Sequence, residues 1–97
     1  MRVLISPGYG EGWSTWNDDK EIAFDERIID AVERGVCKEE LKELCEDWGY
    51  HDIYMGGFDR LKVVEVPDHT IFRIKEWDGS ESIEMYNADD WLYSGKE

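Results

Sequence analysis

The chain has 97 residues, of which 41% are hydrophobic and 13% aromatic, and its formal net charge is −13. This length supports a single domain over residues 1–97, and the apolar content is that of a folded rather than a disordered protein. No apolar run reaches the ~20 residues of a membrane span and no signal-peptide pattern opens the chain, so we expect a cytoplasmic protein. The negative charge disfavours direct binding of nucleic acid.

The N-terminal residues predict a short central strand followed by an unusual loop. Residues 1–5 are mostly apolar, and the loop, residues 6–19, reads SPGYGEGWSTWNDD. This aromatic loop carries the rings of Tyr9, Trp13 and Trp16 among three glycines. Such a loop must either pack against the rest of the fold or present its rings to a partner or ligand.

Two short amphipathic helices are expected next. Asp25 is a good N-cap for the first helix, and Gly35 is placed to end it. The second helix spans about residues 38–48 and is followed by Gly49. Its apolar stripe has the spacing i, i+3, i+4, i+7 and consists of Leu41, Leu44, Cys45 and Trp48. Neither helix is long enough to be stable alone, so both must pack on a sheet.

The remaining chain predicts strands. Residues 53–55 are a short candidate and residues 61–66 a second one. The strongest pattern is a hairpin of residues 70–77 and 80–86 around the two-residue turn Asp78-Gly79. Residues 87–92 resemble a capped helical turn.

The turn predicts the register of this hairpin. It places Ile74 opposite Ile83 and Phe72 opposite Met85 on one side, and the pair Arg73 and Glu84 on the other. It also places Glu76 opposite Glu81 on the apolar side. Because facing like charges are unfavourable, we expect that end of the hairpin to project into water.

These elements together predict an α+β fold. A small antiparallel sheet would combine the N-terminal strand with the C-terminal meander and hairpin, and the two short helices would pack on one of its faces.

Three patterns suggest chemistry but fit it poorly. Gly8-x-Gly10-x-Gly12 follows a strand, yet it matches neither the dinucleotide fingerprint nor a P-loop, so a packed loop is favoured over a phosphate site. Cys37 and Cys45, with His51 and His69, lack the close cysteine pair of a structural zinc site, and we expect reduced thiols without a metal. Cys37 at a helix start has Glu39 and Glu40 beside it, which oppose its ionisation, so we expect no catalytic residue and no cofactor.

Acidic residues are the strongest compositional signal. They concentrate in residues 18–47 and 76–97, which predicts negative faces that repel nucleic acid and attract a basic protein surface. Aromatic side chains near these acids would supply buried anchors for such an interface. The acids expected to contact a partner are Asp18, Asp19, Glu21, Glu39, Glu40, Glu43, Glu46, Asp47, Glu76, Glu81, Asp89 and Asp90. A merely solvated surface is the simpler alternative.

Four segments carry a resemblance to a known family. They are the opening MRVLISPGYGEGWSTWND, the segment FDERIIDAVERG, and the later YMGGF and EWDGSESIE. Together they resemble a family of small acidic proteins of phages and prophages that has no assigned activity. The resemblance implies a viral context, such as a protein that blunts a host defence, and it assigns no functional residue.

The first functional hypothesis is therefore a non-enzymatic inhibitor that binds a host nucleic-acid-handling protein, such as a CRISPR effector or a restriction nuclease. The second is a protein that sequesters a nucleotide signal on the aromatic loop, with a cation from Arg60, Lys62, Arg73 or Lys75. The third is a structural or assembly protein of the virion. The sequence leaves the oligomeric state open.

Overall fold

The computed structural model describes residues 1–85, and its fold is α+β as predicted. Two α-helices and four β-strands form the framework, and three short 3-10 helices lie in the connections. In chain order the elements are β1 (Arg2–Ile5), η1 (Ser14–Trp16), η2 (Lys20–Ala23), α1 (Glu26–Glu33), α2 (Lys38–Asp47), η3 (Phe58–Arg60), β2 (Lys62–Glu65), β3 (Phe72–Trp77) and β4 (Ser80–Met85).

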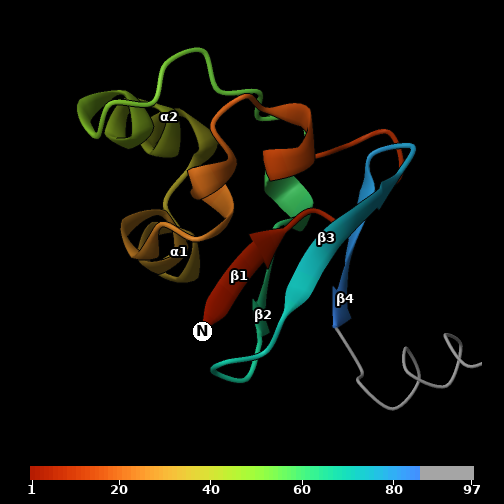
Figure 1. Cartoon of the computed structure of the whole chain (residues 1–97). Coiled ribbons are helices and arrows are strands. Elements are labelled where there is room, and N and C mark those ends of the chain that lie inside the picture. Colours follow the sequence, from red (N-terminus) through yellow and green to blue (C-terminus); the bar gives the residue numbers. More distant parts are fainter. Residues whose placement is uncertain (86–97) are drawn as a thin grey trace, which may run out of the picture.

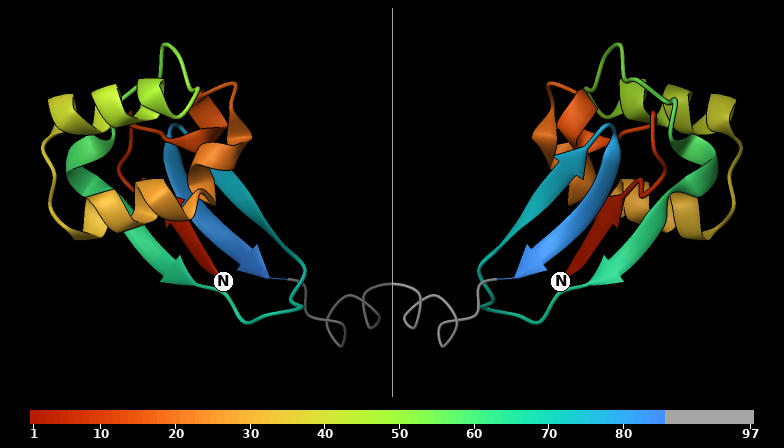
Figure 2. Two further views of the ribbon diagram at one scale, coloured as in Figure 1. Left: turned by 90° about the vertical axis from the view of Figure 1, so that its left-hand side faces the viewer. Right: turned by 90° about the vertical axis from the view of Figure 1, so that its right-hand side faces the viewer.

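The elements form three layers (Figure 1). The helices make the first layer, the antiparallel pair β1–β2 the second, and the antiparallel hairpin β3–β4 the third. In the side views of Figure 2, β1 lies between β2 and the β3–β4 hairpin. The expected single sheet is thus two two-stranded sheets, and the two sheets meet where the Glu81 N–H donates to the Ser6 carbonyl at 2.9 Å.

Alternation along β1 explains this layering. Successive strand side chains point to opposite faces, and β1 is apolar on both. Leu4 packs into a core with Ile28, Ile29 and Leu41 of the helices. Val3 and Ile5 pack on the other side, in a second cluster that the hairpin covers with Phe72, Ile74 and Ile83. A strand with two apolar faces needs a cover on each, so the hairpin stacks on this strand rather than extending its sheet.

Residues 53–55 do not form the strand that was predicted. Ile53 and Met55 are both buried in the helical core, but the segment is an irregular connection between α2 and η3. Its apolar pattern reflects burial of alternate side chains rather than pairing with a neighbouring strand. The predicted helical turn at residues 87–92 lies outside the described residues.

The predicted ends of the helices are confirmed. The Asp25 carboxylate accepts from the Arg27 N–H at 2.9 Å, which caps α1. Gly35 and Gly49 follow the two helices with φ of +80° and +97°, the left-handed conformation that glycine adopts at low cost. Within the described residues, no helix is both long and apolar enough to cross a membrane.

The hairpin register is also confirmed. Phe72 lies opposite Met85, Ile74 opposite Ile83, and Glu76 opposite Glu81. The turn residues Asp78 and Gly79 both have positive φ, 49° and 83°, as a two-residue hairpin turn of this kind requires.

The Asp25 cap predicts a pH dependence of stability. Its hydrogen bond with Arg27 lowers the pKa of Asp25 from 3.8 to about 2. The charged carboxylate therefore stabilises the fold above about pH 4, and this contribution of about 2 kcal/mol is lost as the pH falls through 2.

We expect Asp25→Asn to be less stable than the wild type at pH 6 in urea unfolding, with a difference that shrinks between about pH 4 and 2. An Asp18→Asn control should show no such convergence, because Asp18 is exposed, and a constant difference for Asp25→Asn would contradict the assignment.

Candidate protein-interaction site

The aromatic loop is held in place by a buried carboxylate, Glu81. This side chain is 1% exposed, and both of its oxygens are used. Oε1 accepts from the Ser6 N–H at 2.9 Å. Oε2 accepts from the N–H groups of Trp13 and Thr15, at 2.9 and 3.0 Å, and from the Thr15 hydroxyl. One carboxylate of the hairpin thus joins the first residue of the loop to its middle, at Trp13 and Thr15.

The expectation that Glu81 faces water and contacts a partner is wrong. The register places Glu81 opposite Glu76 as predicted, but the loop folds over this end of the hairpin and supplies four donors to the Glu81 carboxylate. Those donors compensate for the removal of the charge from water. A carboxylate on the apolar side of a strand, beside a glycine-rich loop with free N–H groups, was the signal that could have revealed this contact.

This contact also answers the question of a phosphate site in the loop. Backbone N–H groups of glycine-rich loops bind anions, and here the N–H groups of Ser6, Trp13 and Thr15 are bound to the protein's own anion, Glu81. The loop therefore lacks these donors for a ligand phosphate.

Trp13 forms the buried centre of the loop. Its side chain is fully buried in the helical core, and its Nε1–H donates to the Ile22 carbonyl at 3.1 Å. The Asn17 amide joins the loop to the connection between α2 and η3, since it donates to the Trp13 carbonyl at 2.8 Å and accepts from the Tyr54 N–H at 2.7 Å. Trp13 is consequently a core residue and does not offer its ring to a partner.

The other two rings of the loop remain accessible. Tyr9 is 72% exposed at the tip of the loop, where the Gly10 N–H donates to the Asp78 carbonyl at 2.6 Å. Trp16 is 40% exposed and lies 5.5 Å from the Tyr54 ring, measured between ring centroids. The loop is therefore docked along its length but leaves two aromatic side chains on the surface.

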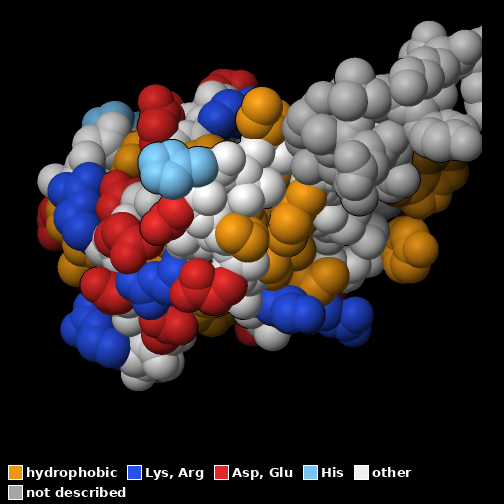
Figure 3. Space-filling view, turned by 60° about the horizontal axis from the view of Figure 1, so that its bottom comes forward, with side chains coloured by type: hydrophobic (Ala, Val, Ile, Leu, Met, Phe, Trp, Pro, Cys, Tyr) orange, Lys and Arg blue, Asp and Glu red, His pale blue; other side chains and the backbone are white. Residues whose placement is uncertain are grey.

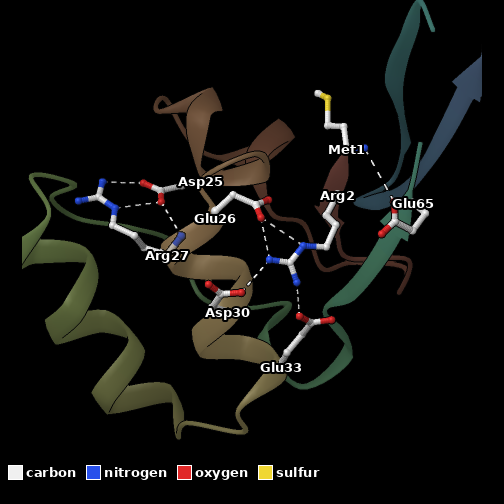
Figure 4. Close-up of polar contacts among 8 residues, drawn as sticks. All are labelled: Met1, Arg2, Asp25, Glu26, Arg27, Asp30, Glu33 and Glu65. Atoms are coloured by element: carbon white, nitrogen blue, oxygen red, sulfur yellow. Dashed lines mark hydrogen bonds and ion pairs between the residues drawn. The ribbon is translucent and has the colours of Figure 1, made fainter. Parts of the chain in front are cut away.

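The acids of α1 converge on one arginine. Arg2 of β1 contacts Glu26 and Asp30, each at 2.7 Å, and also Glu33 (Figure 4). These three carboxylates hold the pKa of the Arg2 guanidinium well above its usual value, with the hydrogen bond to Asp30 the main cause. Arg2 thus fastens α1 to β1, and part of the acidic block at residues 18–47 has a structural role.

The acids of α2 are different. At about 100° per residue they fall within an arc of about 120°, opposite the buried side chains of Leu41 and Cys45. All are exposed, and within residues 1–85 none of them forms an ion pair. We call this set the acidic row; its members are Glu39, Glu40, Glu43, Glu46 and Asp47.

Two aromatic side chains follow α2 and pack against the helical core, on the side of the helix away from the acidic row. Trp48 is half-buried directly after α2, and the Arg27 guanidinium lies 4.9 Å from the centre of its ring. The Tyr50 hydroxyl donates to Asp25 at 2.9 Å, and partial burial together with this bond raises the pKa of Tyr50 to about 12. Glu21 is exposed on η2, and its charge contributes to the raised pKa of Tyr50.

The remaining acids that were predicted to contact a partner do not belong to the acidic row. Asp18 is exposed and Asp19 half-buried in the loop before η2. Glu76 is exposed on β3, where it accepts from the Trp16 Nε1–H at 3.3 Å and from the Gly79 N–H at 2.7 Å. Asp89 and Asp90 lie outside the described residues. The structure does not bring these acids together with the acidic row into one continuous face.

Charged side chains nevertheless gather on the helical side of the molecule. Figure 3 shows acidic and basic groups interspersed over that side and hydrophobic side chains over the ends of the strands. On the face drawn, the helical side thus differs in character from the ends of the strands and fits a charged partner better.

The cysteines are free thiols in different surroundings. Cys37 is exposed at the N-cap of α2, while Cys45 is buried and its burial raises the pKa of that thiol to about 11. Across residues 1–85, no three His, Cys, Asp or Glu side chains come together in a group that could hold a metal ion.

Comparisons with known proteins bring no relative. No protein-family model matches the chain, and neither a curated protein nor a solved structure matches it. The resemblance to small acidic phage proteins therefore stays a prediction, and the functional argument depends on the site alone.

Proposed function

We propose that this protein is a non-enzymatic inhibitor that binds the basic, nucleic-acid-binding surface of a host protein through the acidic row of α2. A CRISPR effector or a restriction nuclease in the host cytoplasm is the class of target that the resemblance suggests. The observation that carries the proposal is the acidic row itself, five exposed carboxylates without an ion-pair partner in the described chain.

The contrast between the two helices supports this use of α2. Both helices carry several acids, but those of α1 converge on Arg2, whereas those of α2 face solvent. Five carboxylates over about 12 Å of helix repel one another, and within the described residues none of them forms an ion pair. A basic partner would relieve this repulsion on binding.

The physical consequence is a salt-dependent interaction. Exposed carboxylates steer a basic surface over a distance set by the Debye length, which is about 10 Å at 0.1 M salt and about 4 Å at 0.5 M.

The test compares two variants of equal net charge. In the first, the row is neutralised as Glu39→Gln, Glu40→Gln, Glu43→Gln, Glu46→Gln and Asp47→Asn. The matched control changes five acids elsewhere, as Asp52→Asn, Asp59→Asn, Glu65→Gln, Asp68→Asn and Asp78→Asn. Tagged wild type and both variants are incubated with host lysate at 0.05 and 0.5 M salt, and the captured proteins are identified.

We expect the wild type and the control to retain a nucleic-acid-binding protein at low salt only, and the row variant to retain at least tenfold less of it. Duplex DNA should then displace the retained protein, because both ligands occupy the same surface. Equal retention by the two variants, or a captured protein that still binds DNA normally, would contradict the proposal.

The two other functional hypotheses lose or lack support. A nucleotide-sequestering role of the aromatic loop would have Trp16 and Tyr9 as its accessible rings, because Trp13 is buried, and Glu81 occupies the N–H groups of Ser6, Trp13 and Thr15. The virion structural or assembly role stays an untested prediction.

A further inference from the structure

The outer edge of β3 is unpaired in the described part of the chain. β3 pairs with β4 only, and Trp77 lies opposite Ser80 next to the two-residue turn. In such a hairpin the pair beside the turn is hydrogen-bonded and the pattern then alternates. The backbone groups of Phe72, Ile74 and Glu76 therefore point away from β4, and none of them has a backbone partner within residues 1–85.

A groove runs beside this edge. Its volume is about 460 Å³. β3 forms one wall and the segment from η1 to the residue after η2 forms the other, and the lining residues are Ser14, Thr15, Lys20, Phe24, Phe72, Arg73, Ile74 and Glu76. Phe24, which is 39% exposed, packs edge-on against Phe72 with ring centroids 6.0 Å apart. The groove thus combines an apolar floor with an open strand edge.

The charged side chains that line the groove are already bonded within the protein. The Lys20 ammonium donates to the carbonyls of Ser14 and Asn17, at 2.8 and 2.6 Å. Glu76 accepts from Trp16 and Gly79. The free backbone groups of β3 are therefore available at the groove, and they are complementary to another extended chain.

We propose that β3 binds an extended segment of a partner protein, which adds a strand to the hairpin. Alternate side chains of that segment would enter the groove over Phe24, Phe72 and Ile74, so they should be apolar. The intervening side chains would lie on the opposite face beside Arg73 and Lys75, whose side chains are 66% and 53% exposed. These two cations share one carboxylate, that of Glu84, so a net positive charge remains on this face. Opposite charges stabilise cross-strand pairs, so these residues should be acidic.

A second copy of this chain fits the same edge poorly. In an antiparallel pairing of two β3 strands by a twofold axis, Arg73 of one copy faces either Lys75 or Arg73 of the other, or Lys75 faces Lys75. Each of these registers opposes two cations, which is unfavourable. Cations on an edge strand also hinder unspecific pairing, and the same charges then select an acidic segment.

This inference does not depend on the function proposed for α2. The acidic row belongs to the helical layer and β3 to the layer on the other side of β1–β2, so the two surfaces lie on opposite sides of the molecule (Figure 1). Failure of one interaction would leave the other untouched.

The test uses two synthetic peptides and the full-length, isotope-labelled protein. The acidic probe is acetyl-Gly-Glu-Val-Glu-Val-Glu-Val-Gly-amide, and the basic probe has Lys in place of every Glu. Each is titrated at about 0.15 M salt, where the Debye length of about 8 Å limits repulsion by the acidic row. We expect the acidic peptide to shift the backbone amide signals of Phe72, Ile74 and Glu76 and to bind about tenfold more tightly than the basic peptide.

A charge reversal makes the test specific. The double variant Arg73→Glu and Lys75→Glu should prefer the basic peptide instead, whereas the control Lys38→Glu and Lys42→Glu, with the same change of net charge on α2, should keep the original preference. The proposal is overturned if neither peptide shifts the three amides at millimolar concentration, if the preference does not reverse, or if sedimentation shows that β3 pairs with a second copy.

Discussion

Replacing Glu81 by glutamine is expected to lower the free energy of unfolding by about 2–4 kcal/mol. The substitution keeps the shape of the side chain but removes its charge and one acceptor oxygen. Four donors converge on the two oxygens of Glu81 in a site that water does not reach. In the less costly orientation, the new NH₂ group faces the Ser6 N–H, so one buried donor loses its partner and the remaining bonds lose their ionic character.

Urea unfolding of the variant measures this loss, and Glu84→Gln is its matched control. Glu84 lies on the same strand but on the other face, where it pairs with the exposed side chains of Arg73 and Lys75. An ion pair in that setting contributes about 0–1 kcal/mol. If the two variants are equally stable, Glu81 does not hold the aromatic loop.

Gly79→Ala is expected to lower the free energy of unfolding by about 3 kcal/mol or more. Gly79 has φ of +83°, and a Cβ built there would overlap the backbone of Glu11, including its carbonyl oxygen. The loop backbone passes directly over the hairpin turn at this point, and neither segment can move without disturbing the bonds of Glu81. A side chain at position 79 should therefore displace the loop.

Gly35→Ala separates the two causes of this effect. Gly35 has nearly the same φ, +80°, but a Cβ there meets no atom within 4 Å. Its substitution should cost only the conformational term, about 1–2 kcal/mol. Thermal unfolding of both variants gives the comparison, and an equal shift of the midpoint would show that the loop does not press on Gly79.

Local patterns in the sequence predicted the local elements well. The cap at Asp25, the stops at Gly35 and Gly49 and the register around Asp78 depend on backbone chemistry within a few residues, and each is confirmed. The α+β class follows from the same elements.

The stacking of the two sheets could not be predicted in the same way. It depends on β1 being apolar on both faces, so that helices cover Leu4 and the hairpin covers Val3 and Ile5. A short apolar strand of this kind fits equally well in the centre of a larger sheet. The choice is made by residues more than 60 positions away, which no local pattern contains.

The role of Glu81 shows the same limit for the site. The position of Glu81 opposite Glu76 predicted repulsion and exposure. In the structure the aromatic loop covers Glu81 instead, and its buried carboxylate accepts four hydrogen bonds. Its bonding partners are about 66 to 75 residues away along the chain. The acids of α2, in contrast, were expected on the surface from helical periodicity alone, and the structure places them there.

The most direct test of this account is amide hydrogen exchange of Ser6, Trp13 and Thr15, measured by NMR in the wild type and in Glu81→Gln. If the loop is a docked part of the fold held by Glu81, these three amides should exchange in the wild type about as slowly as those of β1, and at least tenfold faster in the variant. Rapid exchange of all three in the wild type would contradict the account, because the aromatic loop would then be an open element available to a ligand.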